Sequence, residues 1–322
     1  MDLRTPFINE YGRLRSGWRL VLFVAAATAC YFLLGVVLWS GWYVVHATGV
    51  RLPYESLIFD LLYRWLILAV ALIAGYGCAR FLEDMPWRSL GLTLHQHWFR
   101  DFLIGSLIGI LSLSIAVLIA KVAGGFRFNV SGRAVIGGVV KSLTGSCVLF
   151  VIAALAEEAM FRGYPLQTLS RAKLLWLGIF LTSVPFAGAH LLNPHTVPGF
   201  TFANTALAGI WLGLAYLRTR SLWFPLGVHW AWNWALGSLY GLPVSGLTLV
   251  SHPLLRATDL GPTWLTGGDY GIEGGAACTV ALIVSSIFIW KTGLVSATPE
   301  LMKLTSEEIP RTPPDVLSIR NS

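Results

Sequence analysis

The chain has 322 residues, of which 55% are hydrophobic and only 12% are charged, and its mean hydropathy is +0.67. A soluble domain of ordinary composition has roughly 25% charged residues. This composition therefore excludes a protein that is surrounded by water over most of its surface. The net charge of +7 comes from dispersed basic residues, which form no clustered patch for nucleic acid.

Apolar runs of about 20 residues are what a helix needs to cross a bilayer. The sequence contains eight candidates, at residues 18–45, 57–79, 102–120, 135–162, 173–192, 203–217, 221–241 and 276–290. Tryptophans near the ends of these runs, such as Trp18, Trp98 and Trp290, are typical of membrane interfaces. We therefore predict an all-α fold, a polytopic transmembrane helical bundle of about eight spans.

We divide the chain into three regions by composition. Residues 1–134 hold the N-terminal transmembrane helices, and residues 135–241 hold every motif described below. Residues 242–322 hold a long loop rich in Gly and Pro, the last transmembrane helix and a polar tail. The tail after Lys291 has the composition of a disordered cytoplasmic end.

The basic residues predict the orientation, because cytoplasmic loops of membrane proteins carry an excess of Lys and Arg. If the N-terminus is cytoplasmic, sixteen of the 23 Lys and Arg residues fall on the cytoplasmic side and six on the other. Both termini are therefore expected in the cytoplasm. The compact chain favours a multi-pass protein of a bacterial inner (plasma) membrane.

The segment AEEAMFRG, residues 156–163, places three charges in an otherwise apolar run. Such groups are costly within a membrane, on the order of 3 kcal/mol each, unless they face protein or a water-filled cavity. Glu158 and Arg162 are four residues apart, so they share a helix face and are expected to pair. Glu157 points about 100° away and is left to face something else. An ion cluster at the membrane edge is the purely structural alternative.

Two later apolar runs carry polar residues at helical spacing. In SVPFAGAH, Phe186 and His190 are four residues apart, and in VHWAWN, His229 and Asn233 are four residues apart. Each pair alone could serve only in helix packing. Together with Glu157, they supply a base, two imidazoles and an amide donor, which is a set suited to hydrolysing an acyl bond.

The ordered motifs EExxxR, FxxxH and HxxxN, on successive apolar runs, resemble the CPBP family of intramembrane proteases. This family is also called the Abi or CAAX-protease family, and its eukaryotic member is the prenyl protease Rce1. The resemblance covers about residues 135–241, as the CPBP/Abi catalytic core. It implies an intramembrane endopeptidase whose catalytic residues are Glu157, Glu158, Arg162, His190, His229 and Asn233.

The resemblance implies a role for each residue. Glu157 would act with His190 to position and deprotonate the attacking water, while His229 and Asn233 would donate hydrogen bonds to the oxyanion. Glu158 and Arg162 would fix the helix and tune the site. The partners expected are a membrane-associated peptide or protein substrate and the lipid bilayer, with no nucleic acid.

We expect no cofactor, because an oxyanion donor explains Asn233 better than a poor zinc ligand does. The alternative is Zn²⁺ bound by Glu157, His190 and His229, although the sequence has no HExxH. Two other functions compete with a protease. One is a non-catalytic membrane binding or bacteriocin-immunity protein. The other, less favoured, is a transporter, which should carry charged or polar relay residues in both halves of the chain, and only Asp60 and Arg64 are candidates for this in the first half.

Overall fold

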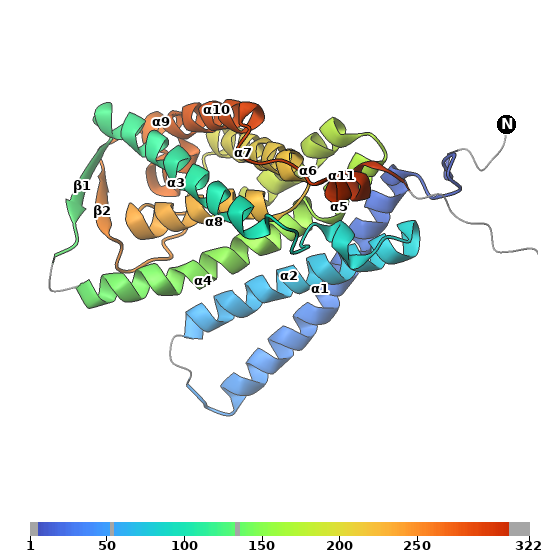
Figure 1. The fold of residues 1–322 in the computed structure, drawn as a ribbon. Coiled ribbons are helices and arrows are strands. Elements are labelled where there is room, and N and C mark those ends of the chain that lie inside the picture. Colours follow the sequence, from blue (N-terminus) through green and yellow to red (C-terminus); the bar gives the residue numbers. More distant parts are fainter. Residues whose placement is uncertain (1–5, 52–54, 133–135, 309–322) are drawn as a thin grey trace, which may run out of the picture.

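The computed structural model (Figure 1) describes residues 6–51, 55–132 and 136–308. Each of the eight predicted apolar runs coincides with a helix. These helices are α1 (Ser16–Ala47), α2 (Glu55–Glu83), α3 (Trp98–Val122), α4 (Ile136–Phe161), α6 (Leu175–His190), α7 (Pro198–Thr219), α8 (Trp223–Trp234) and α10 (Ala276–Lys291). The predicted all-α helical bundle is confirmed.

Five helices in the described part of the chain are long and apolar enough to cross a membrane. They cover Ser16–Ala47, Leu57–Glu83, Trp98–Val122, Ile136–Arg171 and Pro198–Thr219. Helices α6 and α10 are apolar but shorter, with 16 residues each, and α8 has 12. The total of eight spans therefore stays a prediction.

Helix α1 presents a continuous apolar surface at the edge of the bundle (Figure 1). Leu33 and Val37, one turn apart, are 70% and 69% exposed, and Phe32 and Val36 beside them are similarly open. Exposed apolar patches of this extent are rare on soluble monomers. This face fits contact with lipid tails.

Glycines hold α3 and α8 in direct backbone contact. A Cβ atom on Gly105 or Gly109 would lie 2.3 Å from a carbonyl oxygen of α8, and one on Gly227 would lie 2.2 Å from the Phe102 oxygen. Close backbone approach through small residues is the usual way in which membrane helices pack. It fixes the position of α8 and hence of His229, which follows the contact residue Val228.

Helix α4 ends at Phe161 and a second short helix, α5 (Tyr164–Arg171), follows it. Gly163 makes this break possible, because a Cβ atom there would lie 2.2 Å from the Ala159 oxygen. Helix α2 packs on α4 through Leu68 and Ala71 against Ala156 and Ala159. The charged segment of α4 is thus held between neighbouring helices.

Short elements complete the fold. They are η1 (Trp87–Leu90), strand β1 (Phe126–Val130), a π-helical turn (Ala235–Leu239), strand β2 (Leu255–Asp259), α9 (Thr263–Thr266), η4 (Gly268–Tyr270), η5 (Ile272–Gly274) and α11 (Pro299–Ser306). The two strands pair antiparallel, with Phe126 opposite Asp259. Strand β2 belongs to the long loop 242–275, so this pairing ties the loop to the bundle.

The tail after Lys291 was predicted to be disordered, and for residues up to 308 this is wrong. Helix α11 packs on α5, where the Ser170 hydroxyl donates a 2.8 Å hydrogen bond to the Thr305 carbonyl. Leu301 and Thr305 on its inner face are buried. The prolines at 310, 313 and 314 lie outside the described residues.

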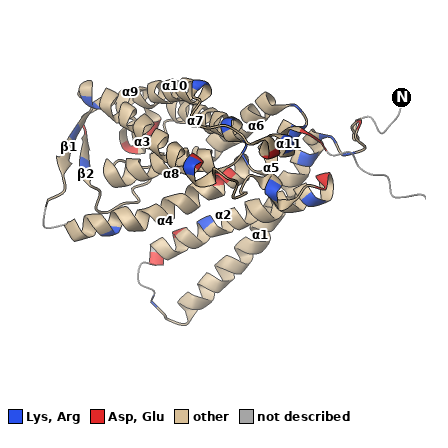
Figure 2. Ribbon diagram, in the orientation of Figure 1, with Lys and Arg blue, Asp and Glu red and all other residues tan. Residues whose placement is uncertain are grey.

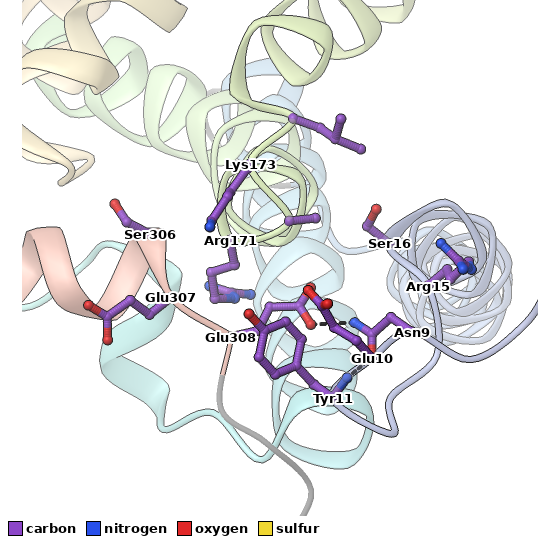
Figure 3. Close-up of a pocket in the computed structure, with 12 residues that line it drawn as sticks. Asn9, Glu10, Tyr11, Arg15, Ser16, Arg171, Lys173, Ser306, Glu307 and Glu308 are labelled. Atoms are coloured by element: carbon purple, nitrogen blue, oxygen red, sulfur yellow. Dashed lines mark hydrogen bonds between the residues drawn. The ribbon is translucent and has the colours of Figure 1, made fainter. Parts of the chain in front are cut away.

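A buried ion network joins the first and last parts of the chain. Glu83 pairs with Arg19 at 2.6 Å and with Arg171 at 2.8 Å, and Arg19 also reaches Glu308 at 3.1 Å. Figure 3 shows the pocket of about 590 Å³ beside this network, where both basic and acidic side chains gather. Glu308 also accepts a hydrogen bond from Asn9, so this region anchors the two end segments to α2 and α5.

Candidate active site

A second cavity, of about 540 Å³, lies among α2, α4, α6, α7, α8 and the loop 242–275. Four of the six predicted site residues line it, and they come from three helices: Glu157 from α4, His190 from α6, and His229 and Asn233 from α8. Glu158 and Arg162 are fully buried behind its wall. The structure therefore brings the predicted set together around one space.

The predicted pairing of Glu158 with Arg162 is confirmed. Their side chains form an ion pair of 3.1 Å, and both are 0% exposed. Arg162 also donates to the Gly209 carbonyl at 3.0 Å, and its guanidinium lies 4.7 Å from the centre of the Phe186 ring. This arginine links α4 to α6 and α7, which carry other parts of the cavity wall.

His229 lies between the two carboxylates of α4. Its Nδ1 is 2.9 Å from Oε1 of Glu158, and its Nε2 is 3.6 Å from Oε2 of Glu157. A carboxylate accepts hydrogen bonds, so the shorter contact places a hydrogen on Nδ1. Glu158 therefore accepts hydrogen bonds from both Arg162 and His229, and it orients the imidazole with Nε2 toward Glu157.

Glu157 is the carboxylate that faces the cavity. Its side chain is 28% exposed, against 0% for Glu158. Its Oε2 atom has no hydrogen-bond partner among the described residues. The partly exposed carboxylate of Glu157 is consequently the one that a molecule in the cavity can reach, in agreement with the spacing argument that separated the two glutamates.

His190 is the last residue of α6. Its Nδ1 lies 2.8 Å from the Phe186 carbonyl, and the two rings are 4.6 Å apart between centroids. Because a carbonyl only accepts, Nδ1 carries a hydrogen, and Nε2 is the nitrogen left for a molecule in the cavity. No hydrogen bond joins His190 to Glu157 within the described ranges, although both line the cavity.

The long loop contributes residues that the motifs did not reveal. Glu273 accepts hydrogen bonds from the Trp232 indole at 3.0 Å and from the Ser245 amide at 2.6 Å. Asn204 of α7 donates to the Glu273 carbonyl at 2.8 Å, and Asn193 donates to the Ser245 carbonyl at 3.1 Å. Together these contacts fasten the loop to the helices that line the cavity.

The zinc alternative requires Glu157, His190 and His229 to converge as ligands. Among the described residues, no group of three His, Cys, Asp or Glu side chains is arranged to hold a metal ion. Nδ1 of each histidine already makes a hydrogen bond within the protein. Metal dependence stays a question for experiment.

A comparison with protein families matches residues 139–235 to the family described as type II CAAX prenyl endopeptidase Rce1-like. No curated protein and no solved structure matches the chain. The matched region contains all six predicted site residues, and the resemblance predicted from the three motifs is confirmed over it. Together with its long apolar helices, the match supports an integral membrane protein with a CAAX-protease-like region.

Proposed function

We propose that this Rce1-like membrane protein is an intramembrane endopeptidase that uses Glu157 as the general base. The observation that carries the proposal is the position of Glu157. Its side chain is 28% exposed and lines a cavity that His190, His229 and Asn233 also line, and its one ion contact among the described residues, to His229, is 3.6 Å long. A carboxylate with so loose a partner is costly inside a membrane bundle, so a functional use is the expected reason for it.

In the proposed reaction, Glu157 accepts a proton from water as the water oxygen attacks the peptide carbonyl carbon. His190 holds that water through Nε2, since its Nδ1 is engaged by the Phe186 carbonyl. Collapse of the tetrahedral intermediate breaks the carbon–nitrogen bond. Glu157 then delivers its proton to the departing amine, which completes the balance of the reaction.

The negative oxygen of the tetrahedral intermediate needs donors. The Asn233 amide lines the cavity one helical turn beyond His229, where it can donate. His229 can donate from Nε2 when its ring carries a proton on both nitrogens, while its Nδ1–H group still donates to the Glu158 carboxylate. Losing one such donor typically costs about 10²–10³ in turnover.

The proposed substrate is a membrane-associated peptide, and a prenylated C-terminal peptide is the one that the family description suggests. Apolar side chains such as Ile67, Phe150 and Leu212 form much of the cavity wall and suit aliphatic residues. We expect no cofactor, with zinc as the tested alternative.

The test uses purified protein in lipid vesicles and a quenched fluorescent peptide. The peptide contains an S-farnesyl cysteine followed by three aliphatic residues, and its hydrolysis is measured as a rise in fluorescence. Glu157→Gln should abolish cleavage while the protein still folds and binds the peptide. Glu300→Gln is the matched control, because Glu300 lies on α11, is 67% exposed and pairs with Arg88 outside the cavity. Wild-type rates in Glu157→Gln would refute Glu157 as the general base, whereas no cleavage by the wild type would favour the non-catalytic binding or immunity function.

A further inference from the structure

Arg64 places a positive charge in the wall of the same cavity. It lies on α2, outside the region that matches the family, and it lines the cavity together with Glu157. Leu68, one turn later on α2, packs against Ala156 and Ala159 of α4. The face of α2 that carries Arg64 is therefore the face turned toward the catalytic segment.

Arg64 has no protein partner in the described part of the chain. Its guanidinium forms no ion pair with a described carboxylate, and its Nε atom is buried without a hydrogen-bond partner there. Asp60, one turn earlier, also lines the cavity but forms no ion pair with it within the described ranges. Figure 2 shows that charged positions are few along the long helices of the bundle, α2 among them.

The other arginines deep in the bundle behave differently. Arg162 pairs with Glu158, and Arg19 and Arg171 both pair with Glu83. An arginine in a membrane helix is expensive unless it is paired or serves a function. The exception at Arg64 therefore indicates an anionic group that enters from outside the chain.

We infer that Arg64 binds the free C-terminal carboxylate of the peptide substrate, an inference that rests on the proposed function. The guanidinium is planar and matches a carboxylate with two parallel hydrogen bonds. A cavity of about 540 Å³ has the size of a pocket for a small ligand and suits a short chain end rather than a long segment.

The arrangement of the helices also bears on the direction of the bound peptide. Helix α4 lies between α2 and α8 (Figure 1), and Arg64, Glu157 and His229 of these three helices line one cavity. Neighbouring helix axes are typically about 8–10 Å apart. An extended peptide covers that distance in about three residues. A carboxylate on Arg64 would thus place the bond to be cut a few residues from the chain end, near Glu157.

The experiment compares two forms of the farnesylated peptide, one with a free C-terminal carboxylate and one with a carboxamide. Wild type should cleave the free acid with a kcat/KM about tenfold or more above that of the amide, because charged hydrogen bonds are strong. In Arg64→Gln this ratio should fall to near one, and Arg64→Lys should retain part of it. Arg80→Gln is the matched control, since Arg80 is exposed on the same helix and pairs with Asp84 at 3.5 Å.

Several outcomes would overturn the inference. Equal cleavage of acid and amide by wild type would do so and would leave the protease proposal intact. Equal slowing of both peptides in Arg64→Gln, with the ratio kept, would mean that Arg64 is only structural. If Arg64 binds a lipid phosphate instead, activity should depend on anionic lipid in the vesicles, Arg64→Gln should lose that dependence, and the ratio should stay unchanged.

A binding measurement separates this inference from the proposed function. Fluorescence anisotropy with Glu157→Gln protein in vesicles reports affinity for both peptides without turnover. Preference for the acid, lost in Glu157→Gln/Arg64→Gln, would support the Arg64 site even if wild type cleaved neither peptide. Equal affinity for both peptides, or no binding of either, would refute the site.

Discussion

Replacing Glu158 by Gln tests the buried ion pair on which the candidate site depends. The change keeps the size of the side chain but leaves the Arg162 charge, which is 0% exposed, without its carboxylate. Breaking one partner of a buried pair costs about 3–5 kcal/mol. The Gly209 carbonyl and the Phe186 ring, at 3.0 Å and 4.7 Å, stay as weaker partners of the guanidinium. We therefore expect a large loss of stability, equivalent to a shift of roughly 10 °C in Tm.

The assay heats the protein in detergent and measures, by size-exclusion chromatography, how much of the monomer peak remains at each temperature. Glu157→Gln is the matched comparison, because its carboxylate is 28% exposed and its closest ion contact is 3.6 Å. It should leave Tm nearly unchanged. The double variant Glu158→Gln/Arg162→Met should recover part of the stability, since an apolar replacement of a buried pair is often tolerated.

Hydrolysis should not recover in that double variant, because His229 has lost the carboxylate that orients it at 2.9 Å. Two results would refute this reasoning. Equal loss of folded protein in Glu157→Gln and Glu158→Gln would make Glu157 a structural residue. Wild-type stability in Glu158→Gln would mean that the neighbouring carbonyl and ring already satisfy Arg162.

Three further predictions concern the oxyanion, the metal and the topology. Asn233→Ala should lower turnover by about 10²–10³ if the amide stabilises the oxyanion, whereas a role in packing would cost roughly 1 kcal/mol of stability and leave the turnover of folded protein unchanged. Activity should survive a strong chelator such as phenanthroline, and stoichiometric zinc that is lost and restored together with activity would instead make Glu157, His190 and His229 ligands. Reporter fusions should place both termini in the cytoplasm, and an extracytoplasmic C-terminus would contradict the count of spans.

Contacts within one helix were the part of the site that spacing could predict. The pair of Glu158 with Arg162 and the tilted ring contact of Phe186 with His190 both follow from a separation of four residues. The break after Phe161 also follows from local sequence, because Gly163 and Pro165 predict a kink or a second helix there.

Contacts between segments were beyond the sequence. Glu273 lies in a loop without periodicity, so nothing in its spacing points to Trp232, 41 residues away, which it holds at 3.0 Å. The packing of α11 was missed for a related reason, because its polar composition hides the buried face of Leu301 and Thr305. The residues of the candidate site could be predicted from motifs within helices, whereas the loop contacts that close the cavity depend on tertiary structure.

Partners, rather than the mere presence of charge, distinguish the residues that we propose to be functional in this bundle. Glu158, Arg162, Glu83 and Arg171 are buried in ion pairs, and such pairs account for their own presence. Glu157 and Arg64 lie in the same apolar surroundings, but both line one cavity; in the described structure Glu157 has only a 3.6 Å ion contact with His229, and Arg64 forms no ion pair. These two groups match the two features of a peptide end. The Glu157 carboxylate would activate the water that attacks the bond to be cut, and the Arg64 guanidinium would bind the negative charge of the terminal carboxylate. The transporter alternative would need Asp60 and Arg64 to act together as a relay, yet in the described part they form no ion pair with each other, and both line the cavity of the proposed catalytic base.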